Sequence, residues 1–203
     1  MKVVGILGSP STVSRSASLL QLAHAGLQSF ASSYHLLSVR NLPAEAVLWG
    51  DANNPVVGEA LAIVAGADVV LVATPIYKSA YSGLLKAFLD LLPSDALSGK
   101  VVLPLASGGT IAHLLALEYT LKPVLAALGA RHVLDPVFAT DAQIPRHESF
   151  GYLPGPEVQD RIGTSLRPVI ERAEELRVLA DAGRQGRDLV ARAQLFHQPQ
   201  EAS

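Results

Sequence analysis

The stretch VGILGSPSTVSRSASLL, residues 4–20, leads from a short apolar strand through a hydroxyl-rich turn into a helix. The N-terminus of a helix leaves several backbone N–H groups unpaired and carries roughly half a positive charge from the helix dipole, so it attracts anions. The Arg15 guanidinium can bond two oxygens of one anion at once. A helix cap needs only one or two hydroxyl groups, so this turn favours a phosphate site over simple capping. The hydroxyl groups belong to Ser9, Ser11, Thr12, Ser14 and Ser16.

The turn lacks the motifs of two common phosphate loops. No G-x-x-x-x-G-K-[ST] is present, which excludes the loop of nucleoside triphosphatases, and no G-x-G-x-x-G follows the strand, which excludes the dinucleotide fingerprint. A single phosphate therefore fits the turn best. Flavodoxin-like proteins bind the phosphate of FMN in this way, after the first strand of an open parallel sheet.

Length and composition indicate one globular domain with a large core. The chain has 203 residues, of which 49% are hydrophobic, and its mean hydropathy is +0.31. The formal charge is −2 and no run of residues is densely basic. Neither a nucleic acid nor a membrane surface is therefore an expected partner.

The chain contains no cysteine, which excludes disulfides, thiolate catalysis and cysteine-ligated metals. The first strand is expected to begin at Lys2, which leaves no room for a signal peptide. No apolar run approaches the length of a membrane span without a charge or a helix breaker. These features lead us to expect a cytoplasmic protein.

Apolar runs alternate with segments of helical spacing along the chain. The run at residues 68–74 is the most hydrophobic and is expected at the centre of a sheet, whereas the mixed run at 34–39 fits a sheet edge. The segment 41–55 is expected to be a loop in which Trp49 is an apolar plug or, alternatively, a flavin contact. Strands are expected at residues 2–7, 34–39, 68–74, 100–105 and 131–137. Helices are expected at 16–30, 57–65, 84–92, 113–128 and 156–181.

This alternation predicts an α/β fold with a flavodoxin-like, doubly wound, five-stranded parallel sheet and helices on both faces. The carboxyl ends of parallel strands share one edge, so loops 9–16, 75–82 and 107–110 are expected to converge there. The paired glycines of the third loop would let a ligand lie against the backbone. We expect this domain to span residues 1–180 and to be followed by a polar, mobile tail at 181–203.

Three segments resemble the NADPH-dependent FMN reductases of the flavodoxin-like superfamily. They are GSPSTVSRS at 8–16, ATPIYKSAYSG at 73–83 and PLASGGTIAH at 104–113. The segment LEYTLKPVL at 117–125 extends the resemblance to the reductase component of two-component alkanesulfonate monooxygenase systems. Many of these reductases carry an arginine where this chain has Ser11, and Arg15 is expected to compensate. The resemblance covers residues 1–180.

The resemblance implies an NAD(P)H:FMN oxidoreductase. NADPH or NADH would reduce FMN, and the reduced FMN would leave for a partner flavin-dependent monooxygenase of sulfonate metabolism. The FMN phosphate would lie in loop 9–16 and the isoalloxazine ring between 75–78 and 107–110. The flavin carries the chemistry, so no catalytic side chain is expected, and a backbone N–H of 75–78 would be the donor to flavin N5. The implied cofactor-binding residues are Ser9, Ser11, Ser14, Arg15, Ser16, Pro75, Ile76, Tyr77, Lys78, Ser107, Gly108, Gly109 and Thr110.

Other kinds of catalytic site find little support. No G-x-S-x-G nucleophile elbow is present, and Ser107 precedes two glycines without an evident base partner. His113, at the opening of an apolar helix, is expected to make a structural hydrogen bond rather than to act in catalysis. No metal site is expected, because His132 and His147 lack ligand spacing with their neighbours.

The charged residues near these segments are expected to be structural. Lys86 and Asp90 stand four residues apart on a predicted helix and should form a surface ion pair. Asp141 and Arg146 follow the last predicted strand, and we expect them in a solvated loop rather than at the border of the site.

Two other functions of the same fold stay open. A flavodoxin-like electron carrier would retain its FMN, but such carriers are typically strongly acidic, unlike a chain with a charge of −2. A quinone or azo-compound reductase that retains FMN is not excluded by charge. The sequence does not decide between NADPH and NADH, because no motif for the 2′-phosphate is visible.

The predicted helix at 113–128 is apolar on almost every side, and one sheet can cover only one of them. We therefore expect a homodimer or, as the resemblance suggests, a homotetramer. Pro123 cannot donate an N–H to the carbonyl of Tyr119, so the helix must contain a kink or a π-bulge. In the reductases that the chain resembles, a tyrosine here marks a π-helical insertion at a subunit interface near the flavin. Tyr119 is expected to be such a flavin-transfer and interface residue, the alternative being a buried core aromatic.

Overall fold

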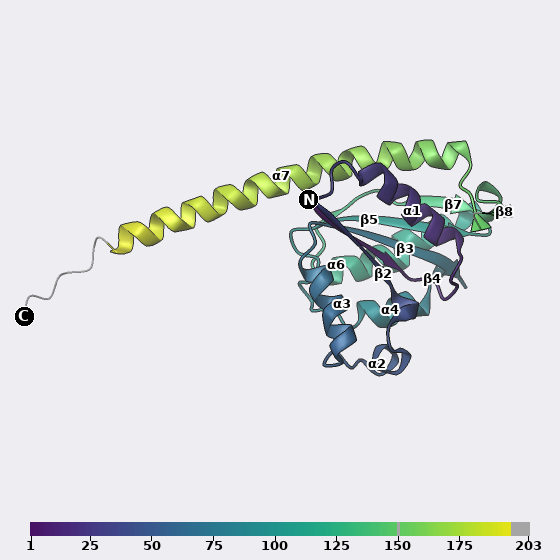
Figure 1. The fold of residues 1–203 in the computed structure, drawn as a ribbon, viewed down its shortest axis with the longest axis horizontal. Coiled ribbons are helices and arrows are strands. Elements are labelled where there is room, and N and C mark those ends of the chain that lie inside the picture. Colours follow the sequence, from purple (N-terminus) through teal and green to yellow (C-terminus); the bar gives the residue numbers. More distant parts are fainter. Residues whose placement is uncertain (150, 196–203) are drawn as a thin grey trace, which may run out of the picture.

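A parallel sheet forms the centre of the computed structural model, which describes residues 1–149 and 151–195 (Figure 1). Strand β3 pairs with β1 on one side and with β5 on the other, and β2 lies at the edge beyond β1. The far side of β5 pairs with β6 and then with β7. The strands are β1 (Lys2–Leu7), β2 (Ser33–Ser38), β3 (Val69–Tyr77), β5 (Val101–Gly108), β6 (His132–Val133) and β7 (Val137–Thr140). The α/β, flavodoxin-like fold with a parallel sheet is confirmed.

Helices cover both faces of this sheet (Figure 1). Alternate residues of β3 point to opposite faces, so Val70 and Val72 pack with one cluster of helices whereas Val69 and Leu71 pack with the other. The helices of the first face are α2 (Ala44–Trp49), α3 (Pro55–Ala65), α4 (Gly83–Leu89), α5 (Leu114–Ala116) and α6 (Lys122–Ala127), and those of the second face are α1 (Arg15–Leu27) and α7 (Pro156–Leu195).

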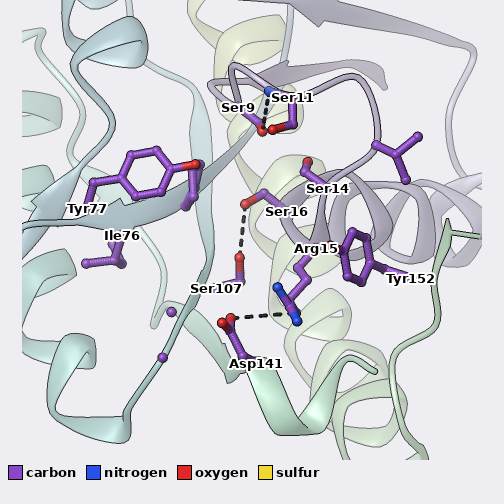
Figure 2. A pocket seen from close by; sticks show the side chains of 14 residues that line it. Ser9, Ser11, Ser14, Arg15, Ser16, Ile76, Tyr77, Ser107, Asp141 and Tyr152 are labelled. Carbon is purple, nitrogen blue, oxygen red and sulfur yellow. Dashed lines mark hydrogen bonds and ion pairs between the residues drawn. The ribbon is translucent and has the colours of Figure 1, made fainter. Parts of the chain in front are cut away.

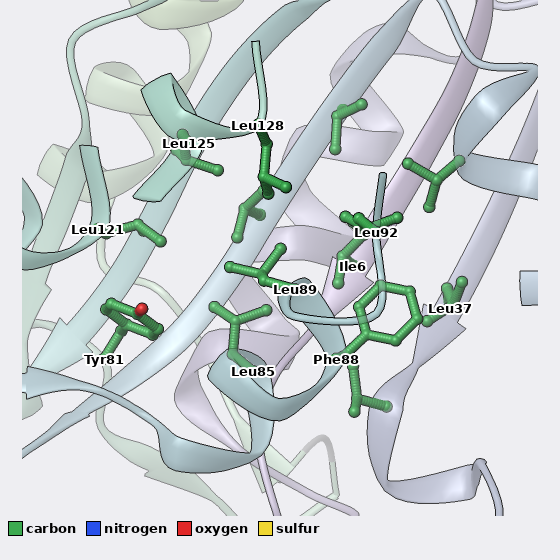
Figure 3. Packing of buried hydrophobic residues seen from close by; sticks show 14 of the residues in the cluster. Ile6, Leu37, Tyr81, Leu85, Phe88, Leu89, Leu92, Leu121, Leu125 and Leu128 are labelled. Atoms are coloured by element: carbon green, nitrogen blue, oxygen red, sulfur yellow. The ribbon is translucent and has the colours of Figure 1, made fainter. Parts of the chain in front are cut away.

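The core of the first face is built around Phe88 of α4, which is fully buried (Figure 3). Leu85 and Leu89 on the same helix are also buried, and Ile6 reaches this cluster from β1. On the second face, the buried stripe of α1 packs against α7 and the sheet. Both faces of β1, β3 and β5 are thus buried, as their continuous apolar sequences predict.

Two features of the chain differ from the sequence prediction. The expected strand at 131–137 is broken into β6 and β7, because Pro136 has no N–H for a sheet hydrogen bond. The expected loop at 41–55 contains the short helix α2, preceded by the 3-10 turn η1 (Val39–Asn41). Trp49, at the end of α2, is 80% exposed and therefore is not the apolar plug that we expected.

The region of Tyr119 is π-helical, as the position of Pro123 predicts. A 3-10 turn η2 (Ile111–His113) leads into α5, the π-helical segment η3 (Leu117–Leu121) follows, and α6 begins at Lys122. Tyr119 is 76% exposed, which excludes the alternative of a core aromatic. Ile111 and Leu115 precede it at intervals of four residues and are also exposed, so the three side chains form an apolar stripe that we call the Tyr119 stripe.

Helix α7 is longer than expected. It begins at Pro156 as predicted, but it continues past Asp181 to Leu195. Its first half buries Val158, Ile162 and Val169 against the sheet, whereas its second half projects beyond the sheet (Figure 1). The division into a domain at 1–180 and a mobile tail at 181–203 stays a prediction, and residues 196–203 of that tail lie outside the described residues. Within 1–149 and 151–195, no helix combines the length and apolar character that a membrane span requires.

The close approach of Gly8 to α4 generates a stability prediction. A Cβ at Gly8 would lie 2.6 Å from Leu85 Cβ, whereas a Cβ at Gly163 on α7 would meet nothing within 4 Å apart from the neighbouring backbone of its own helix. Gly8→Ala should therefore lower the free energy of unfolding by about 1–3 kcal/mol through overpacking. Gly163→Ala is the matched control and should raise it by about 0.4–1 kcal/mol, because alanine restricts the unfolded chain and favours the helix. Urea unfolding of both variants measures the difference, and equal stability of the two would contradict the packing argument.

Candidate functional site

A cleft of about 280 Å³ opens at the carboxyl edge of the sheet, where three loops meet (Figure 2). The first loop joins β1 to α1, the second continues from β3, and the third follows β5. The residues that line the cleft are Ser9, Ser11, Val13, Ser14, Arg15, Ser16, Pro75, Ile76, Tyr77, Ser107, Gly108, Gly109, Asp141 and Tyr152. The expected convergence of the three loops is therefore confirmed.

The hydroxyl groups of the first loop are tied into its structure. Ser14 is the N-cap of α1, and its Oγ accepts a hydrogen bond of 3.1 Å from the Ala17 N–H. Ser9 is buried, and its Oγ accepts a hydrogen bond of 3.2 Å from the Ser11 N–H. Both side chains thus hold the backbone of the loop, Ser14 as the helix cap and Ser9 within the turn, and both residues also line the cleft.

Ser16 connects the first loop to the third. Its buried Oγ lies 3.1 Å from Ser107 Oγ, so one of the two hydroxyls donates to the other (Figure 2). Each hydroxyl has one O–H group, so the contact uses one of the two and leaves the other as a donor for a ligand. The contact holds the first turn of α1 beside the end of β5.

Arg15 lies against the far wall of the cleft. Its Nε donates a hydrogen bond of 3.1 Å to the Ile144 carbonyl and lies 3.6 Å from Asp141 Oδ1. The guanidinium also stands over the Tyr152 ring, 4.6 Å from the ring centre. Tyr152 belongs to a two-stranded sheet of β8 (Arg146–His147) and β9 (Gly151–Tyr152). These contacts fix the position of the Arg15 guanidinium. Arg15 is the one cationic side chain among the described residues that line the cleft.

The second loop is a β-hairpin rather than an irregular loop. β3 continues to Tyr77, which pairs with Ala80 of the short strand β4 (Ala80–Tyr81). The two turn residues, Lys78 and Ser79, both have positive φ angles of 49° and 61°, the backbone that a tight two-residue hairpin requires. Burial raises the pKa of Tyr81 to about 12, with a smaller contribution from the Asp90 carboxylate.

Ser82 ties the base of the hairpin to the first loop. Its Oγ donates to the Gly8 carbonyl and accepts a hydrogen bond of 3.1 Å from the Leu85 N–H, which caps α4. Its own N–H donates to Thr74 Oγ1 at 3.1 Å. Both Ser82 and Thr74 are buried, so this junction between the hairpin and the first loop is closed to solvent.

The third loop places Gly108 and Gly109 at the cleft. A Cβ at Gly108 would lie 2.9 Å from His113 Nδ1 and 3.3 Å from the Phe138 ring, so only glycine fits there without movement. The Nδ1 atom of His113 is buried and has no hydrogen-bond partner among the described residues. The structural hydrogen bond that we expected from His113 is therefore not made by this nitrogen.

Most of the predicted binding residues line the cleft, and the structure adds three others. Lys78 and Thr110 are the two predicted residues that do not line it. Asp141, which we expected in a solvated loop, lines the cleft and lies beside Arg15. Arg146 is exposed and does not line the cleft. Val13 and Tyr152 were missed. No local pattern marks Tyr152, because it reaches Arg15 only through the folding of the β8–β9 hairpin.

Among residues 1–149 and 151–195, no group of three or more His, Asp or Glu is arranged to hold a metal ion. Lys86 and Asp90 form the expected surface ion pair, with Nζ 2.6 Å from Oδ1. The cleft therefore combines a helix N-terminus, one arginine, several hydroxyls and an apolar second wall, which suits a ligand with an anionic end and a flat ring.

Comparisons with known proteins point in the same direction. The family model described as NADPH-dependent FMN reductase matches residues 1–144. A protein of Escherichia coli strain K12 named FMN reductase (NADPH) is 46% identical over 167 residues, which are 82% of this chain and 86% of that protein. A protein of the same name from Pseudomonas putida KT2440 is 48% identical over 71% of this chain and 73% of its own length. The solved apo structure of an NADH:FMN oxidoreductase named EMOB superimposes with a TM-score of 0.72 at 39% identity, covering 87% of this chain and 88% of that one.

Proposed function

The chain belongs to the NADPH-dependent FMN reductase family, and from this premise we propose how its cleft serves the reduction of FMN by a nicotinamide nucleotide. The single observation that carries the assignment of the cleft is the meeting of the α1 N-terminus with Arg15 and an apolar wall at one sheet edge. FMN, when bound, supplies the chemistry, since its ring accepts hydride from the reduced nucleotide. The protein supplies binding and orientation.

The phosphate end of FMN fits the first loop. The first turn of α1 opens into the cleft with the Ser16 hydroxyl and the Arg15 guanidinium, and Ser11 lies at the rim. A helix N-terminus and a guanidinium both stabilise a phosphate. We assign Ser9, Ser11, Ser14, Arg15 and Ser16 to this end of the ligand.

The ring end of FMN fits between the second and third loops. Pro75 and Ile76 give an apolar surface, while Gly108 and Gly109 present backbone without side chains. A flat ring can lie close to such a backbone, and N–H groups of the β3–β4 hairpin are the candidate donors to its N5 atom. Lys78 and Thr110 flank these segments, and we keep them as outer contacts of the ring or of the nucleotide. The choice between NADPH and NADH is not set by any residue identified in the cleft.

We further propose that reduced FMN leaves the cleft for a partner monooxygenase of sulfonate metabolism. The cleft is open to solvent, and Tyr77 at its rim is 50% exposed. In this proposal FMN is a departing substrate rather than a retained group.

The phosphate assignment predicts a selective loss of FMN affinity. Arg15→Ala and Ser16→Ala each remove a donor to the phosphate, and each charge-assisted bond is worth about 1.5–3 kcal/mol, roughly ten- to a hundredfold in affinity. Riboflavin lacks the phosphate, so its affinity should change little. Flavin fluorescence quenching measures both dissociation constants, with Arg167→Ala on the exposed side of α7 as the matched control. Equal losses for FMN and riboflavin would refute the phosphate assignment.

We propose that the Tyr119 stripe is a subunit interface in a homodimer or homotetramer. Ile111, Leu115 and Tyr119 are 66%, 57% and 76% exposed, and together they leave an apolar strip of helix in water. Leu115→Glu should lower the mass measured by light scattering at micromolar concentration, because it places charge in the interface. Gln21→Glu, at an exposed polar residue of α1, adds the same charge outside the Tyr119 stripe, so it is the control and should leave the mass unchanged. A monomer mass for the unmodified protein would exclude the interface.

We also propose that Tyr119 influences whether FMN departs. Tyr119→Ala would remove the aromatic ring from the π-helical segment while leaving the packed residue Leu121 in place. The purified variant should retain more FMN and deliver less reduced FMN to a partner oxygenase. Absorbance of co-purified flavin measures retention. Phe30→Ala is the control, because it removes an exposed aromatic ring beyond the C-terminal end of α1, whereas the N-terminal end of that helix borders the cleft. If Tyr119→Ala changes stability but neither retention nor transfer, the tyrosine has no role in flavin release.

A further inference from the structure

The charges that line the cleft cancel. Arg15 and Asp141 are the only charged residues among the described residues of the lining, so their formal charges sum to zero. A guanidinium strengthens a phosphate site that otherwise rests on a helix N-terminus and hydroxyl groups, because the ligand brings close to two negative charges of its own. The cleft also places a carboxylate 3.6 Å from its single guanidinium.

Asp141 is not required to hold Arg15 in place. The Nε–H of Arg15 donates to the Ile144 carbonyl at 3.1 Å, and the Tyr152 ring supports the flat side of the guanidinium. The 3.6 Å separation between Nε and Asp141 Oδ1 is longer than a normal hydrogen bond. Ile144 and Tyr152 therefore hold the Arg15 guanidinium in place, whereas Asp141 adds a negative charge beside it.

The backbone at Asp141 is also fixed without its side chain. Asp141 is the first residue of the 3-10 turn η4 (Asp141–Gln143), which follows β7. The turn is capped by Thr140, whose N–H donates to Gln143 Oε1 at 2.9 Å while its side chain accepts from the backbone of Gln143. An isosteric change at Asp141 thus removes the charge and keeps both the turn and the Arg15 anchor.

We propose that Asp141 sets the affinity of the cleft for phosphate-bearing flavins by offsetting the charge of Arg15. The inference rests on the proposed function, in which the flavin phosphate lies beside Arg15. The carboxylate repels the phosphate and competes for the guanidinium, so it weakens the binding of FMN without affecting a flavin that has no phosphate. The side chains of Arg15 and Asp141 are 29% and 49% exposed, so solvent and salt screen the effect and keep it moderate. Asp141 in this way favours the release of the flavin product.

The test is the affinity of Asp141→Asn for FMN and for riboflavin, measured by fluorescence quenching at low and at high salt. FMN should bind about three- to tenfold more tightly than to the unmodified protein at low salt, and the gain should shrink at high salt. Riboflavin should bind unchanged. Asp141→Glu keeps the carboxylate and should behave like the unmodified protein, and Asp90→Asn is the control for a charge removed from an exposed ion pair away from the cleft.

Each contrary outcome overturns the proposal in a recognisable way. Weaker FMN binding with riboflavin unchanged would mean that Asp141 positions Arg15 after all. Equal changes for both flavins would mean that the residue acts through packing, and no change would mean that its charge does not reach the phosphate. If both the unmodified protein and Asp141→Asn bind FMN no better than riboflavin, the placement of the phosphate beside Arg15 in the proposed function is wrong.

Discussion

The backbone of Gly8 is held on both sides, and the geometry of the cleft depends on this. Its N–H donates to the Ala73 carbonyl at 2.8 Å, and its own carbonyl accepts from the buried Ser82 hydroxyl. The lack of a side chain lets Leu85 pack directly on it. The first loop is thereby joined to the base of the β3–β4 hairpin, and the contact between Ser16 and Ser107 joins it to the third loop. Hydrogen bonds within the protein thus join the three loops into one connected frame, and these bonds do not depend on a ligand.

Much of this frame could be predicted from the sequence because its determinants are local. The continuous apolar run that becomes β3 needs burial on both faces, and the turn before α1 carries its hydroxyls and glycine within nine residues. Pro123 is a further local determinant, because it cannot donate an N–H to the carbonyl of Tyr119 and its ring crowds that carbonyl. The structure accordingly has the π-helical segment at Tyr119.

Other parts depend on contacts that no local pattern encodes. Asp141 and Tyr152 reach Arg15 from segments more than a hundred residues away, and only the path of the chain after β7 brings them there. Trp49 is exposed because α2 turns it outward, although its size suggested burial. The break between β6 and β7 follows from Pro136 and could have been anticipated. The buried His113 Nδ1, which has no hydrogen-bond partner within residues 1–149 and 151–195, could not.

The length of α7 bears on how the molecule moves through solution. A helix of 40 residues spans about 60 Å at 1.5 Å per residue, and its second half extends beyond the sheet in Figure 1. Such a projection increases hydrodynamic friction much more than it increases mass. The protein should therefore elute from a sizing column earlier than a sphere of 21.4 kDa. An apparent size obtained from elution alone would exaggerate the number of subunits, whereas scattered light reports mass independently of shape.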